Sequence, residues 1–88
     1  QWLEARGDKP FFLYVPFTHV HFPTLPHPEF AGRTGAGDIG DAMAEMDRNV
    51  GAILDAIAKL GIARNTIVIW ASDGGAEARR PWRGTAGP

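Results

Sequence analysis

Two short stretches of the chain carry side chains that could do chemistry. Residues 72–75, Ser-Asp-Gly-Gly, come directly after an apolar run of β-branched and aromatic residues. A carboxylate at that point can ligate a hard metal ion, and glycines allow positive φ angles and a close approach of backbone. The same four residues are also typical of an ordinary turn, because Asp and Gly favour turns for local reasons. Both interpretations stay open from spacing alone.

The second stretch, residues 18–21, is Thr-His-Val-His. In an extended segment, His19 and His21 lie on the same side of the backbone. The pair could bind a metal ion, hold an anion, or have no chemical role. Two histidines do not complete a metal site, since a zinc or related site needs more ligands. His27 lies between two prolines, and we expect it at the surface.

The elements that must position these residues are two strands and a helix. Residues 11–15 form a continuous apolar run between two prolines, and residues 67–71 form another. Such runs are typical of strands covered on both faces. Between the first strand and residue 37, the prolines make regular structure unfavourable, and all three histidines lie in this stretch. A helix is predicted from about residue 41 to residue 60, with Asp38 or Asp41 as its cap and Gly61 as its stop.

The helix prediction rests on apolar residues that recur at three- and four-residue steps: Ile39, Met43, Met46, Val50, Ile53, Leu54, Ile57 and Leu60. Gly51 interrupts this pattern and would mark close packing. A short helix tail is predicted at residues 1–6, with Gly7 as its end. Strand, helix and strand in this order predict an α/β fold, with a βαβ crossover and a partial parallel sheet. Ligands gather at the carboxyl ends of such strands, where the loops with His21 and Asp73 begin.

Composition limits the function classes. The 88 residues carry a net charge of −1, which does not favour binding to nucleic acid or to an anionic membrane surface. The chain has no cysteine, so a disulfide, a thiolate metal site or a cysteine nucleophile cannot come from it. No apolar run reaches the roughly 20 residues that span a bilayer. The cellular compartment stays open.

The stretches "PFFLYVPFTHVHFP" and "GDAMAEMDRNVGAILDAIAKLGIARNTIVIWASDGG", followed by "RG", resemble the central part of a sulfatase of the arylsulfatase type, in the alkaline-phosphatase superfamily. The resemblance implies that residues 1–88 are one segment from the interior of a catalytic domain with an alkaline-phosphatase-like fold, and not a complete domain. It implies hydrolysis of a sulfate ester with a divalent metal ion, calcium, and a formylglycine nucleophile. The Cys/Ser-x-Pro-x-Arg motif that gives rise to formylglycine is absent from this chain and is expected upstream.

Residue by residue, the resemblance assigns Asp73 as a metal ligand. It assigns His21 as the catalytic histidine that contacts the sulfate or the leaving oxygen. Arg83 lies in the approach to the family's lysine-bearing segment and is a weaker substrate-binding candidate; Asp47 matches a position with a structural role. Gly74 departs from the pattern, since the family carries Asn or His there, and the metal would lose one side-chain ligand.

Other classes of function and partner stay open beside this resemblance. A phosphodiesterase or phosphonate hydrolase of the same superfamily would differ in its upstream nucleophile. A degenerate, non-catalytic segment is favoured by Gly74 and by the missing nucleophile. The expected partners are a sulfate-ester small molecule or glycan and the rest of the catalytic domain. The isolated segment is expected to associate with itself through exposed strand surface.

Overall fold

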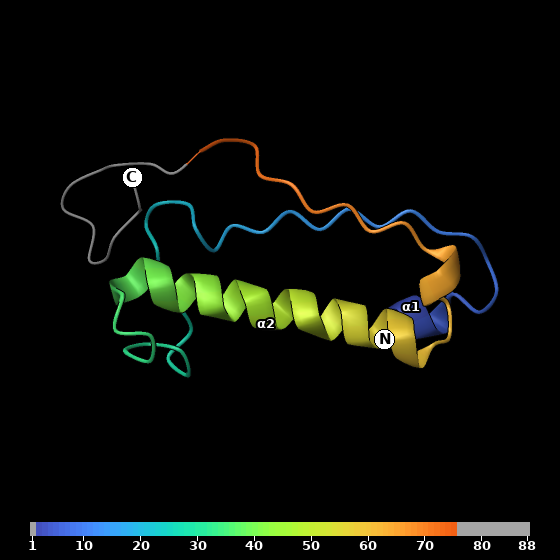
Figure 1. The fold of residues 1–88 in the computed structure, drawn as a ribbon, viewed down its shortest axis with the longest axis horizontal. Helices are drawn as coiled ribbons and strands as arrows, with labels where there is room; N and C mark the ends of the chain where they lie inside the picture. The colour runs from blue at the N-terminus through green and yellow to red at the C-terminus, as the bar shows by residue number, and fades with distance from the viewer. Residues whose placement is uncertain (1, 76–88) are drawn as a thin grey trace.

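A computed structural model describes residues 2–75 of the chain. In this part the regular elements are a short helix α1 (Trp2–Ala5), a long helix α2 (Gly37–Lys59) and a 3₁₀ turn η1 (Ala63–Asn65). Two extended segments precede α2 and follow η1. Both run in the same direction along one side of α2, which runs the opposite way (Figure 1).

The predicted partial parallel sheet is wrong. Within residues 2–75 no β-strand forms, and no backbone hydrogen bond joins residues 11–15 to residues 67–71. The two segments nevertheless meet, since the ring centroids of Phe17 and Trp70 are 5.8 Å apart. Parallel sheets are stable when helices cover both faces, whereas here α2 lies on one side alone. The chain therefore follows the course of a strand–helix–strand unit without hydrogen-bonded strands.

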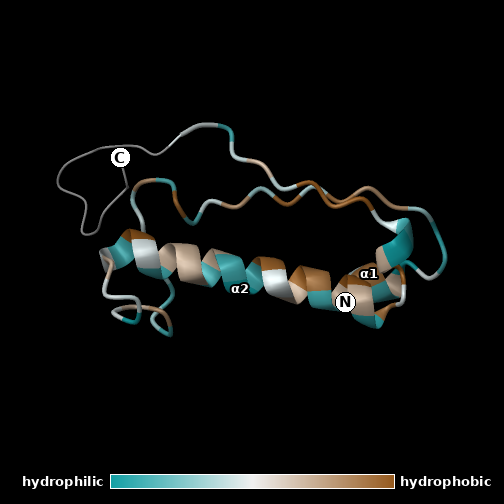
Figure 2. Ribbon diagram, viewed as in Figure 1, coloured by the Kyte–Doolittle hydropathy of each residue, from teal (hydrophilic) through white to brown (hydrophobic). Residues whose placement is uncertain are grey.

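The two extended segments are largely apolar, as the colouring of Figure 2 shows. Alternate residues are almost fully exposed there, and we call them the outer apolar face: Phe12 (89%), Tyr14 (77%), Ile67 (90%) and Ile69 (84%). Their neighbours Leu13 and Val68 are less exposed, at 41% and 53%. This alternation is the period of two expected for extended backbone. One side of each segment is thus partly covered and the other is open.

The buried apolar core is small and centres on α2. Among the described residues, the buried apolar side chains are Leu3, Ile39, Ala42 and Ile57. Only part of the predicted apolar stripe of α2 is covered, because Met43 remains 52% exposed. Close packing at Gly51 is also a wrong prediction for this chain, since nothing lies within 4 Å of the place a Cβ would occupy.

The carboxyl end of α2 is as predicted. Gly61 adopts a φ of 70°, which glycine tolerates best. Its amide donates to the carbonyl of Ala58, and the amide of Ile62 donates to the carbonyl of Ile57. This pair of bonds is a Schellman motif, which satisfies carbonyls left over at the helix end. Gly7 likewise follows α1 with a φ of 64°.

The amino end of α2 differs from the prediction, because the N-cap residue is Ala36 and makes no side-chain capping bond. Asp41 instead reaches back to the preceding loop. Its carboxylate accepts hydrogen bonds from the Thr34 hydroxyl (2.7 Å), the Thr34 amide (2.9 Å) and the Gly32 amide (2.6 Å). The hydroxyl and backbone donors of Thr34 lower the pKa of the Asp41 carboxyl, against the opposing effect of its burial. Asp41 therefore fixes the loop that leads into the helix.

No helix within residues 2–75 combines the length and the apolar character needed to cross a bilayer.

Candidate functional site

Asp73 lies in an exposed turn that follows the second extended segment. The Ser72 hydroxyl donates to the carbonyl of Gly74 (2.7 Å), so local bonds stabilise this turn. Asp73 does not belong to any metal-binding group: among residues 2–75 there is no cluster of three or more His, Cys, Asp or Glu side chains that could hold an ion. One carboxylate does not make a calcium site, which takes six to eight oxygen ligands. Asp73 can thus contribute one ligand to a site completed by other residues.

His21 is exposed and ends a turn in which its amide donates to the carbonyl of Thr18 (3.0 Å). Its Nδ1 lies 2.7 Å from the carbonyl oxygen of Phe22. A carbonyl can only accept, so Nδ1 carries the proton in this contact. The other ring nitrogen, Nε2, is then the one that can face a ligand. It accepts a hydrogen bond when the ring is neutral and donates one when the ring is protonated.

His19 does not join His21 in a common site. It turns toward α2, where its Nε2 lies 3.5 Å from Oε1 of Glu45 and 3.3 Å from Nδ2 of Asn49. The ring also meets Phe17 edge to face, with centroids 5.6 Å apart. The two-histidine metal pair considered from the sequence therefore gains no support from the geometry, because the rings have separate partners.

Glu45 also binds the far end of the histidine loop. Its Oε2 accepts a hydrogen bond from the backbone amide of His27 at 2.8 Å. This bond lowers the pKa of the Glu45 carboxyl, and the charge of His19 lowers it further, while partial burial acts in the opposite direction. His27 itself is exposed, as predicted. Just beyond it, Glu29 pairs with Arg48 of α2 at 2.9 Å.

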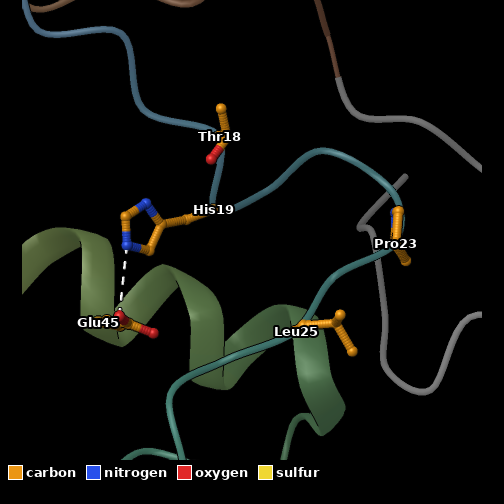
Figure 3. A pocket seen from close by; sticks show the side chains of 5 residues that line it. All are labelled: Thr18, His19, Pro23, Leu25 and Glu45. Carbon is orange, nitrogen blue, oxygen red and sulfur yellow. Dashed lines mark ion pairs between the residues drawn. The ribbon is translucent and has the colours of Figure 1, made fainter.

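These contacts surround an open pocket of about 250 Å³ between the histidine loop and α2. It is lined by Thr18, His19, Pro23, Leu25 and Glu45. In Figure 3 the imidazole of His19 points from the loop toward Glu45 on the helix, and the dashed line marks their ion pair. Glu45 and Asn49 were not among the site residues predicted from the sequence. Their spacing of four residues, which puts both on one helix face, was the available signal.

The loops that carry His21 and Asp73 lie at the same end of the molecule, where the two extended segments end (Figure 1). The contact between Phe17 and Trp70 brings the segments together just before these loops. Asp47 is exposed on α2. Arg83, the weaker substrate-binding candidate, lies outside the described residues.

Comparison with known proteins gives a consistent result. The family model for sulfatases matches residues 1–87. Over 79 residues the chain is 43% identical to arylsulfatase A of Homo sapiens, which covers 90% of this chain and 16% of that protein. It is 43% identical over 74 residues to an N-acetylgalactosamine-6-O-sulfatase of Bacteroides thetaiotaomicron, covering 84% of this chain and 14% of that protein.

A third relative is the steryl-sulfatase of Rattus norvegicus, with 47% identity over 75 residues, 85% of this chain and 13% of that protein. The chain thus spans only a small part of the length of the curated relatives it matches. No solved structure matches it.

Proposed function

Because the chain belongs to the sulfatase family, we propose that it is an interior segment of the catalytic domain of an enzyme that hydrolyses sulfate esters. The observation that carries this proposal is the match over residues 1–87, together with 43–47% identity to three proteins named as sulfatases. The nucleophile would be a formylglycine supplied by a part of the parent protein outside this chain.

His21 is the residue of this chain that we propose for contact with the sulfate. The hydrogen bond from Nδ1 to the Phe22 carbonyl fixes the ring and leaves Nε2 for the ester. A protonated ring offers Nε2–H to a sulfate oxygen or to the leaving oxygen, and its positive charge favours the anionic group. As the bond between sulfur and the leaving oxygen breaks, that oxygen gains negative charge, and a donor at this position stabilises it.

Asp73 is the residue that we propose as a ligand of a divalent cation, calcium. A hard cation prefers carboxylate oxygens, and when bound it would neutralise negative charge on the sulfate. The other ligands have to come from the rest of the parent protein, because no cluster of three or more His, Cys, Asp or Glu side chains lies among residues 2–75. Gly74 supplies no side chain, so its position contributes at most a backbone oxygen.

The alcohol portion of the substrate is a small molecule or a glycan. The three relatives are named for aryl, steryl and N-acetylgalactosamine sulfates, so the family includes very different alcohols. The sulfate is the shared group, and His21 and Asp73 are proposed to act on that group only.

The rest of the catalytic domain is the proposed partner of the outer apolar face. Four large apolar side chains at 77–90% exposure are unusual on a surface in contact with water. Burying them against further chain stabilises the domain at roughly 25 cal/mol per Å² of apolar surface. The isolated segment would instead cover this face with a second copy of itself.

The test uses the full-length parent protein and a pair of chromogenic esters, an aryl sulfate and the matching aryl phosphate. We expect the unsubstituted protein to turn over the aryl sulfate. Asp73→Ala should lose both bound calcium and turnover, whereas His21→Ala should retain calcium and show reduced turnover. Asp55→Asn, which alters an exposed carboxylate on α2, serves as the matched control. Preferential turnover of the phosphate ester would identify a phosphohydrolase instead, and full turnover in Asp73→Ala would contradict the mechanism.

A further inference from the structure

One carboxylate holds both ends of the loop that carries His21. Oε1 of Glu45 pairs with the ring of His19 at 3.5 Å, and Oε2 accepts the amide of His27 at 2.8 Å. His21 lies between these two points in the sequence. The Glu45 side chain is only 18% exposed and that of His19 is 22% exposed, so the contact between these two side chains is partly shielded from water.

His21 itself makes its hydrogen bonds to its own loop. Its amide bonds to the Thr18 carbonyl and its Nδ1 to the Phe22 carbonyl, and within residues 2–75 no hydrogen bond ties it to α2. These local bonds set the shape of the loop around the ring. The placement of the ring relative to α2 therefore depends on how the loop ends are attached.

From this arrangement we infer that Glu45 is a positioning residue, which holds the His19–His27 loop against α2 and so fixes where His21 meets the sulfate. The inference rests on the proposed function for its catalytic consequence, but the attachment of the loop is a property of the chain itself. Asn49 also helps to attach His19 to α2, since its side-chain amide lies 3.3 Å from Nε2 of His19.

Nε2 of His19 has a partner on α2 whether or not it carries a proton. When it carries a proton, it faces Oε1 of Glu45 at ion-pairing distance (3.5 Å). When its Nε2 is unprotonated, it accepts from the amide of Asn49 (3.3 Å). A glutamine at position 45 retains an oxygen that can accept the His27 amide and gains an amide that can donate to His19. Glu45→Gln should thus preserve much of the attachment, whereas Glu45→Ala removes it.

The attachment is tested by hydrogen exchange of the full-length protein, followed in peptides that cover residues 18–28. In Glu45→Ala we expect exchange in this loop to be about tenfold faster, because a hydrogen bond to a charged group protects an amide by at least that factor. The exchange rate of the loop in Glu45→Gln should lie between those of Glu45→Ala and the unsubstituted protein. Asp55→Asn should leave the exchange rate of the loop unchanged. Unchanged exchange in Glu45→Ala would overturn the inference whether or not the protein hydrolyses sulfate esters.

The catalytic consequence is tested by a double-mutant cycle with His21→Ala. We expect Glu45→Ala to lower kcat for the aryl sulfate by about 10- to 100-fold, since small misplacement of a catalytic group has effects of this size. KM and calcium content should change little. In the His21→Ala background the same substitution should have almost no further effect on kcat, because Glu45 acts only through the contact between His21 and the sulfate.

Independent, multiplying effects of the two substitutions would refute the positioning role. A parent protein without sulfate-ester turnover would instead refute the proposed function, and the exchange measurement alone would then decide whether Glu45 holds the loop.

Discussion

Adding a methyl group at Gly40 should destabilise the chain, whereas the same change at Gly51 should stabilise it. Both glycines lie in α2, where alanine is favoured over glycine by about 1 kcal/mol. At Gly51 nothing lies within 4 Å of the added Cβ, so this gain is realised. At Gly40 the Cβ would lie 2.6 Å from the Cβ of Ala36 and 2.8 Å from the hydroxyl oxygen of Thr34.

Contacts that short force the loop before α2 to move. Overpacking of this kind costs about 1–3 kcal/mol, which exceeds the gain in helix propensity. The displaced Thr34 hydroxyl is also the group that donates to Asp41, so the movement weakens the attachment of the loop. We expect the free energy of unfolding of Gly40→Ala to be about 1 kcal/mol lower than that of the unsubstituted 88-residue chain. The free energies of unfolding of Gly40→Ala and Gly51→Ala should differ by about 2 kcal/mol.

The assay is urea unfolding of the 88-residue chain at low concentration, followed by far-ultraviolet circular dichroism. Gly51→Ala is the matched control, because it makes the same chemical change in the same helix. If Gly40→Ala proved as stable as Gly51→Ala, the close approach of Thr34 and Ala36 to Gly40 would be refuted.

Three further predictions concern the same chain. The Asp41 carboxyl has a lower pKa in the folded chain than in the unfolded chain. Its stabilising effect is therefore present above about pH 4 and is lost as the pH falls through the lowered folded value. Urea midpoints measured from neutral pH downward should fall less steeply in Asp41→Asn than in the unmodified chain. Gly61→Ala should destabilise the end of α2 by about 1–2 kcal/mol, because a φ of 70° is unfavourable for alanine, and the same urea titration measures this. The chain should associate as its concentration rises in sedimentation experiments, and replacing Phe12 and Ile67 by Lys should reduce association; a monomer at all concentrations would contradict the role given to the outer apolar face.

The family assignment and the long helix could be predicted from the sequence because both depend on local or linear patterns. The three- and four-residue spacing of apolar side chains located α2, and Gly61 located its end. The start of α2 was less predictable. It depends on Asp41 bonding to Thr34 and Gly32, which lie earlier in the chain and approach it only through the folded loop.

The sequence by itself determined that residues 11–15 and 67–71 are extended and apolar, since β-branched and aromatic side chains favour that backbone. Whether two such segments pair was decided by tertiary structure, because a parallel ladder requires cover on both faces and α2 covers one. The same holds for the histidines. Their two-residue spacing suggested a shared site, but the fold turns His19 to Glu45 of α2 and leaves His21 with its own loop, because the partners come from a helix distant in sequence.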